Sequence, residues 1–165
     1  MTRRSPDEAI PETAGPARRL ASFAVPSVPG REREALDRVA RSVAGQLPPA
    51  RLDRLKTAVA EATANAIEHG HGCRPDLDVG IEVYRRGEQV VVTITDRGPS
   101  VHGEPGPGDR PEDHPEVPDL ARKLAGEQAP RGWGLFLIRH MVDGMDVMTR
   151  DGRHIVRLAM RAGGD

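Results

Sequence analysis

The sequence has little cysteine and no long hydrophobic run. Cys73 is the only cysteine among 165 residues, which excludes an internal disulfide and any cysteine pair that binds a metal or cycles between redox states. No apolar stretch approaches the length of a membrane span, and the N-terminal segment lacks the continuous apolar core of a secretory signal. These absences predict a cytoplasmic protein without membrane contacts.

An excess of one charge is also missing. The 24 basic residues nearly balance the 25 acidic ones, and the net charge of -1 argues against direct binding of nucleic acid. No Gly-Lys pair occurs, which excludes a P-loop, and the patterns GxGxxG, HExxH and GxSxG are absent as well. Whatever chemistry the chain performs uses none of these sites.

The length predicts one domain, here assigned to residues 17–162 behind a flexible tail at 1–16. Within it, residues 99–130 contain seven of the fifteen prolines and few large apolar residues. This segment folds poorly alone and is long enough to be a lid or a binding loop.

Hydrophobic periodicity predicts strands and helices around this insert. The order, strand, two helices, hairpin, insert, helix and hairpin, favours an α+β two-layer sandwich with a mixed, mostly antiparallel sheet and helices on one face. The expected strands lie at 17–25, 79–83 and 89–95 and on both sides of Asp151-Gly152, and the expected helices at 36–47, 50–69 and 133–143.

Two polar residues stand out on the second predicted helix. Glu61 and Asn65 are four residues apart, so both lie on one face, about 40° apart and away from the apolar stripe. A Glu can accept a proton, and the amide oxygen of Asn is a hard donor suited to Mg²⁺. An ordinary solvated polar pair is the alternative, and such pairs are common on helices.

Asp96 ends a run of β-branched residues and is followed by Arg97 and Gly98. Its carboxylate can accept a hydrogen bond from an exocyclic amine such as that of adenine, and Gly98 allows close approach of a flat ring. A turn that closes a strand is the alternative, because Asp and Gly are common there.

Two further segments are candidate sites. Arg131, Gly132 and Gly134 precede a helical run, where free N–H groups and the positive end of the helix dipole favour a phosphate. His69, His71 and Cys73 have the spacing of metal ligands, although no fourth ligand is evident.

Taken together, LKTAVAEATANAIEHG, VVVTITDRG and RGWGLFLI resemble the N box and the two glycine boxes of the GHKL ATPase and kinase superfamily. The forms TANAIEHG and WGLFLI are similar to those of the anti-sigma factor serine kinases. The resemblance covers residues 17–160 and implies the Bergerat, or histidine-kinase-like ATPase, fold.

The resemblance also implies a role for each matching residue. Asn65 would hold the Mg²⁺ that bridges the phosphates of ATP, and Glu61 would be the base for an attacking serine hydroxyl. Asp96 would bind the adenine amine, with Gly98 beside the ring. Gly132 and Gly134 would lie against the phosphates, with Arg131 as a further phosphate contact, and residues 99–130 would be the ATP lid.

Members of that family act as dimers that sequester a sigma factor and phosphorylate a serine on a STAS-type anti-anti-sigma antagonist. The chain departs from the family pattern at Pro99 and Ser100, and at the last hairpin, where Arg153 or His154 replaces the usual threonine near the adenine. The resemblance thus predicts an ATP-dependent protein serine kinase acting in a sigma-factor partner switch.

Two other functions stay open. A nucleotide-responsive module could sequester its partner without transferring phosphate. A small α+β scaffold could instead bind no nucleotide and use HGHGC as a metal clip. A sensor histidine kinase core fits poorly, because the residues before the N box contain no helical hairpin with a His-Glu phosphoacceptor.

Overall fold

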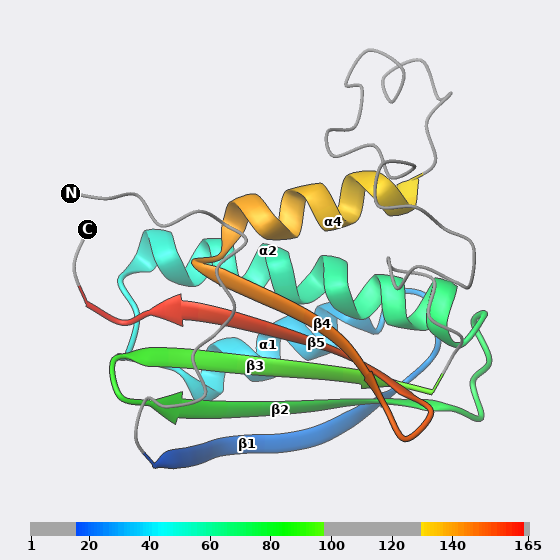
Figure 1. Cartoon of the computed structure of the whole chain (residues 1–165), viewed down its shortest axis with the longest axis horizontal. Coiled ribbons are helices and arrows are strands. Elements are labelled where there is room, and N and C mark those ends of the chain that lie inside the picture. Colours follow the sequence, from blue (N-terminus) through cyan, green and yellow to red (C-terminus); the bar gives the residue numbers. More distant parts are fainter. Residues whose placement is uncertain (1–15, 98–129, 164–165) are drawn as a thin grey trace.

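The structure is a computed structural model that describes residues 16–97 and 130–163, with the backbone alone for 130–135. A five-stranded sheet is covered by helices that come from both ends of the described chain (Figure 1). In chain order the elements are β1 (Ala17–Pro26), α1 (Glu32–Ser42), α2 (Pro49–Asn65), the π-helical turn η1 (Ala66–Gly70), β2 (Asp78–Arg86), β3 (Gln89–Asp96), α4 (Pro130–Met141), β4 (Gly144–Arg150) and β5 (Arg153–Arg161).

The strands are arranged in the order β1-β2-β3-β5-β4, and every pairing between these five strands is antiparallel. The predicted hairpins are confirmed: one joins β2 to β3, and the other joins β4 to β5 across Asp151 and Gly152. Strand β5 inserts between β3 and β4, so the C-terminal hairpin pairs with the middle of the sheet. This pairing places His154 of β5 opposite Asp96 of β3.

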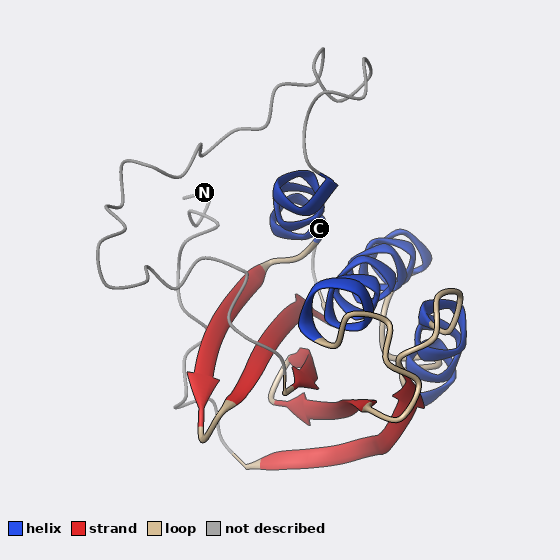
Figure 2. Cartoon of the chain, turned by 90° about the vertical axis from the view of Figure 1, so that its right-hand side faces the viewer, coloured by secondary structure: helices blue, strands red, loops and turns tan. Residues whose placement is uncertain are grey.

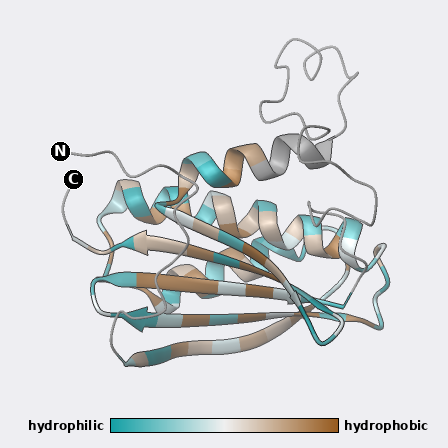
Figure 3. Ribbon diagram, viewed as in Figure 1, coloured by the Kyte–Doolittle hydropathy of each residue, from teal (hydrophilic) through white to brown (hydrophobic). Residues whose placement is uncertain are grey.

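Helices cover one face of the sheet, as predicted (Figure 2). The core lies between the two layers, and alternate residues of the strands point into it. In β3 this alternation buries Val90, Val92, Ile94 and Asp96, and the strand is hydrophobic over its middle part (Figure 3). Asp96 therefore ends an otherwise apolar row on the helix-covered face.

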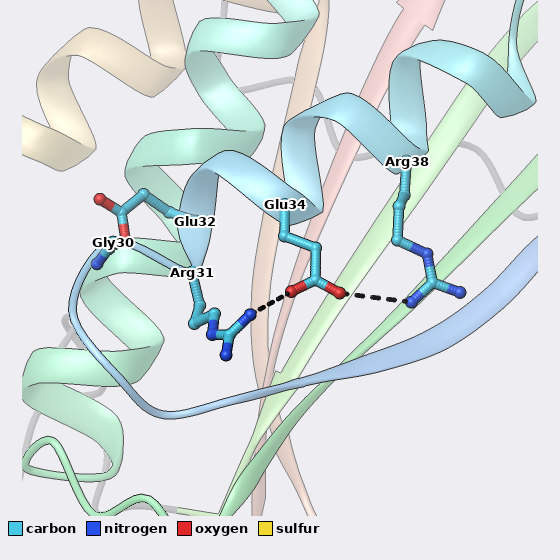
Figure 4. Close-up of polar contacts among 5 residues, drawn as sticks. All are labelled: Gly30, Arg31, Glu32, Glu34 and Arg38. Atoms are coloured by element: carbon cyan, nitrogen blue, oxygen red, sulfur yellow. Dashed lines mark hydrogen bonds and ion pairs between the residues drawn. The ribbon is translucent and has the colours of Figure 1, made fainter.

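Charged side chains organise the first turns of α1 (Figure 4). A carboxylate oxygen of Glu32 accepts a hydrogen bond from the backbone N–H of Gly30 over 2.8 Å. Glu34 pairs with Arg31 at 3.1 Å and with Arg38 at 3.8 Å. These acidic residues favour the start of a helix, because its N-terminus carries partial positive charge.

The helices differ from the sequence-based expectation in three respects, two of them boundaries and one a helix type. Helix α1 spans Glu32–Ser42 where 36–47 was expected, and the chain turns after it, with Gly45 in a left-handed conformation at φ of 78°. The second helix does reach the predicted glycines, but its last turn, η1, is π-helical. Helix α4 begins at Pro130, three residues before the expected position, so Gly132 and Gly134 lie inside its first turns.

None of the helices in the described part of the chain combines the length and the apolarity needed to cross a bilayer. The predicted tail falls outside the described residues except for Pro16. The predicted lid falls outside them except for Pro130, which starts α4.

Candidate functional site

A buried carboxylate marks the end of β3. Asp96 is 3% exposed although it is the last residue of its strand. His154, the residue opposite it on β5, is 1% exposed, and its Nδ1 lies 3.4 Å from Oδ2 of Asp96. Burying a carboxylate is costly unless polar partners surround it, so this placement indicates a site built around the acid.

The backbone of Gly70 lies directly against this carboxylate. A Cβ added at Gly70 would lie 2.5 Å from Cγ and 2.7 and 2.8 Å from the two carboxylate oxygens of Asp96. No side chain fits at such distances, so position 70 must be glycine while Asp96 stays where it is. The π-helical turn η1 thus brings the end of the second helix against the end of β3.

A second buried histidine, His71, forms hydrogen bonds beside the contact between Gly70 and Asp96. The backbone N–H of Arg97 donates to Nε2 of His71 over 2.9 Å. Since a backbone N–H can only donate, Nε2 carries no proton, and the neutral ring has its proton on Nδ1. Nδ1 lies 2.7 Å from Oγ of Ser27, so the ring donates to that hydroxyl. His71 therefore connects the segment after β1 to the residue that follows Asp96.

Burial lowers the pKa of His71 from its ordinary value of 6.5. The nearby charges act in both directions: Asp96 and Asp78 raise this pKa, whereas Arg97 and Arg74 lower it. Desolvation is the largest effect, since the ring is 3% exposed. The neutral ring is also the form that can accept the hydrogen bond from Arg97.

The two residues of the predicted polar pair on α2 differ in burial: Asn65 is buried and Glu61 is partly exposed. Asn65 is 8% exposed at the end of α2, immediately before η1. None of the described residues accepts a hydrogen bond from its Nδ2, which is itself buried. A buried amide with an unused polar atom is suited to a ligand, and its oxygen is a hard donor of the kind Mg²⁺ prefers.

Glu61 instead reaches a groove between α1 and α2. The groove has a volume of about 560 Å³ and is open to solvent. A base in this position can be approached by a group from outside the molecule. The groove is lined by Arg33, Leu36, Asp37, Asp53, Lys56, Thr57, Ala60 and Glu61.

The helix that carries the last predicted motif packs alongside α2. The backbones of Gly132 and Gly134 lie in the first turns of α4, whose N-terminal N–H groups have no partners within the helix. Arg131 lies in the same turn, where the structure describes the backbone alone. Gly98 lies outside the described residues. The elements that carry Asn65, Asp96 and Gly132 are therefore neighbours: η1 contacts β3, and α2 contacts α4.

The metal-clip interpretation of HGHGC is not supported. Both ring nitrogens of His71 take part in hydrogen bonds with Ser27 and Arg97, and Cys73 is exposed. Within the described ranges no three His, Cys, Asp or Glu side chains are grouped to hold a metal ion. Through His71 the segment instead connects the residue after β1 with the residue after β3.

Gly70, His71 and Ser27 were not predicted as parts of the Asp96 site. Gly70 was expected only to end a helix, and His71 only as a metal ligand. The last hairpin did give a signal, because Arg153 or His154 stands where the resemblance leads one to expect a threonine near the adenine. Ser27 gave no signal, since its role depends on the distance to His71 in the folded chain.

Comparison with known proteins shows which family has this fold and these motifs. Residues 25–160 match the family described as histidine kinase-like ATPase domain. The chain belongs to this family.

Two curated relatives are anti-sigma F factors. The protein from Pasteuria penetrans is 31% identical over 129 residues, which cover 76% of this chain and 79% of that one. The protein from Oceanobacillus iheyensis is 31% identical over 121 residues, covering 72% and 76% of the two chains. The chain is thus a homologue of anti-sigma F factors.

A solved structure agrees on the fold. The RsbU and RsbW domains of a Mycobacterium tuberculosis protein superpose with a TM-score of 0.58 at 15% identity. The match covers 88% of this chain but only 33% of that longer chain. The α+β histidine-kinase-like fold expected from the sequence is confirmed.

We expect Gly70→Ala to displace Asp96, because the new Cβ cannot coexist with the carboxylate. Overpacking of this kind lowers the free energy of unfolding by about 1–3 kcal/mol. Gly80→Ala is the matched control, since its Cβ would meet Thr95 at an ordinary 3.9 Å. Urea denaturation measures both variants, and an Ala at position 70 that costs no more than one at position 80 contradicts the contact.

We expect the stability to fall as the pH drops below about 6.5, because His71 has a lower pKa in the folded chain than in the unfolded one. The unfolded state binds more protons in this window, which ends at the folded-state pKa, so acid favours unfolding. His71→Gln keeps an acceptor near Nε2 but does not titrate, and should flatten this part of the curve.

Thermal unfolding between about pH 7.5 and 5.5 measures the effect in both proteins. His140→Gln, which removes a different imidazole and leaves His71 in place, is the matched control. Equal slopes for wild type and His71→Gln would rule out His71 as the titrating group.

Proposed function

We propose that the protein is an ATP-dependent protein serine kinase that acts as an anti-sigma regulatory factor in a partner switch. The observation that carries the proposal is the buried Asp96 carboxylate at the end of β3, held against the backbone of Gly70. Gly70 ends the same helical segment that contains Glu61 and Asn65. The continuous segment formed by α2 and η1 therefore carries Glu61, Asn65 and the glycine that contacts Asp96.

Asp96 recognises the base in this proposal. Its carboxylate accepts a hydrogen bond from the exocyclic amine of adenine, and Gly98 allows the ring to approach the backbone. A buried carboxylate discriminates strongly, because a ligand without a matching donor leaves the acid desolvated and unpaired. A base that carries an oxygen in place of the amine is therefore rejected.

Asn65 holds Mg²⁺ in this proposal. Its buried amide supplies a hard oxygen ligand, and the unused Nδ2 supports a ligand on this side of α2. When bound, the ion neutralises charge on the phosphates. The first turns of α4, with Gly132, Gly134 and Arg131, provide N–H groups and a cation for the same phosphates.

Glu61 is the general base. It accepts the proton of a serine hydroxyl while that oxygen forms its bond to the γ-phosphorus of ATP, and the bond between this phosphorus and the β,γ-bridging oxygen breaks to release ADP. The open groove between α1 and α2 supports this role, because the hydroxyl comes from another protein and must reach the base from outside.

The partners follow from the relatives, which are named anti-sigma F factors. By this analogy the protein binds a sigma factor as a homodimer in the cytoplasm, and its phosphoacceptor is a serine on a STAS-type antagonist. The names of the relatives record sigma-factor inhibition, which favours a second candidate function. In that alternative the nucleotide controls sequestration and no phosphate is transferred.

Mg-ATP should raise the melting temperature of the wild-type protein, because a ligand of the native state stabilises it by RT ln(1 + [L]/Kd). Asp96→Asn should abolish most of this shift, since an amide NH₂ would face the adenine amine. Asn65→Ala should reduce the shift with Mg²⁺ present and have little effect in its absence. Titration calorimetry with ATP checks both variants, and no wild-type binding would refute the proposal.

Glu61→Gln should leave ATP affinity nearly unchanged and reduce phosphate transfer about 10²–10⁴-fold, the usual contribution of a general base. The assay follows label from [γ-³²P]ATP to a serine of a candidate antagonist domain. Asp53→Asn is the matched control, because this acid lines the same groove but has no assigned role. Wild-type binding of ATP and partner without transfer would favour the sequestering module.

A further inference from the structure

We propose that His154 is a positioning residue of the nucleotide-base site: it carries its proton on Nδ1 and orients the Asp96 carboxylate toward the exocyclic amine of the base. This inference rests on the proposed function and deepens it. The last hairpin is also where the chain departs from the family pattern, with Arg153 or His154 in place of the expected threonine.

The register of the sheet brings the two side chains together. Asp96 and His154 are directly paired residues of β3 and β5, and both point to the helix-covered face. Their side chains are 4% and 1% exposed, and Nδ1 lies 3.4 Å from Oδ2. Solvent therefore screens this interaction little.

The charge on Asp96 selects the tautomer of His154. A lone pair on Nδ1 would face the carboxylate and be repelled by it, whereas a proton on Nδ1 is attracted to Oδ2. A proton on Nδ1 therefore gives the buried acid the polar partner that its burial requires. The contact thus fixes the ring as well as the acid.

This contact also determines where the second carboxylate oxygen points. An aspartate can rotate about its Cβ–Cγ bond, and an interaction at Oδ2 stops that rotation. Gly70 closes off another side, since both oxygens lie within 2.8 Å of the position that a Cβ there would occupy. Held between His154 and Gly70, the acid is preorganised for one donor, and preorganisation raises affinity for the matching base.

A purely structural role for His154 is the competing explanation. In that case the ring only fills volume, and any side chain of similar size serves equally well. Asparagine and leucine separate the two explanations. Asn places its Nδ2 where His places Nδ1, whereas Leu fills the space without a donor. Gln offers a donor farther along the side chain, near the place of Nε2, and is a second test if the Leu variant does not fold.

The experiment compares wild type, His154→Asn, His154→Leu and His154→Gln by titration with ATP and with purine riboside triphosphate, which lacks the exocyclic amine. Wild type should prefer ATP. Leu and Gln should reduce this preference by about tenfold, and Asn should keep it within about threefold. Thermal unfolding shows which variants are folded.

A second measurement needs no nucleotide. The ¹⁵N chemical shifts of the His154 ring in the full chain should show the proton on Nδ1, and a proton on Nε2 alone would overturn the inference. Equal preference in the Leu and Asn variants would overturn it as well. Absence of any ATP binding by wild type would refute the proposed function itself, whereas binding without discrimination by the base would refute only the role of His154.

Discussion

Burial of the Asp96 carboxylate is the constraint on which this end of the molecule depends. An ionised acid in a hydrophobic layer is unfavourable unless its surroundings provide donors and exclude crowding. The structure meets this requirement with His154 on the neighbouring strand and with a glycine at position 70. An apolar residue at the end of β3 would need neither the histidine nor the glycine. Their presence therefore indicates that the acid has a function.

The π-helical turn η1 also serves the burial of Asp96, because it positions the backbone of Gly70 and the ring of His71. In η1 the N–H of His71 bonds to the carbonyl of Ala66, five residues back, which widens the last turn of the helix. Such widenings are frequent at functional sites. Here the turn sets Gly70 against Asp96 and delivers His71 to Ser27 and to the N–H of Arg97. The direction in which the chain leaves β3 is fixed by the histidine that follows the glycine.

The sequence predicted the architecture well because the signals are local. Alternation in residues 79–95 and the Asp151-Gly152 turn require only neighbouring residues, and both hairpins are present. The structure buries the two predicted residues Asn65 and Asp96 on elements that lie together, and their binding roles stay predictions. The Asp96–Gly70 and His71–Ser27 contacts could not be predicted, because they join residues 26 and 44 positions apart and depend on a π-turn that has no local pattern.

In the proposed function, the different burial of Glu61 and Asn65 would suit two separate tasks on one helix. Asn65 faces the protected interior, where a cation and its phosphates gain most from a low dielectric. Glu61 lies one turn earlier at the open groove beside α1, where a hydroxyl of another protein can reach it. A base buried as deeply as Asn65 could not receive a macromolecular substrate, and a metal ligand as exposed as Glu61 would compete with water. If the proposed function holds, the one-turn offset along α2 would give the metal ligand a buried position and the base a position open to a protein substrate.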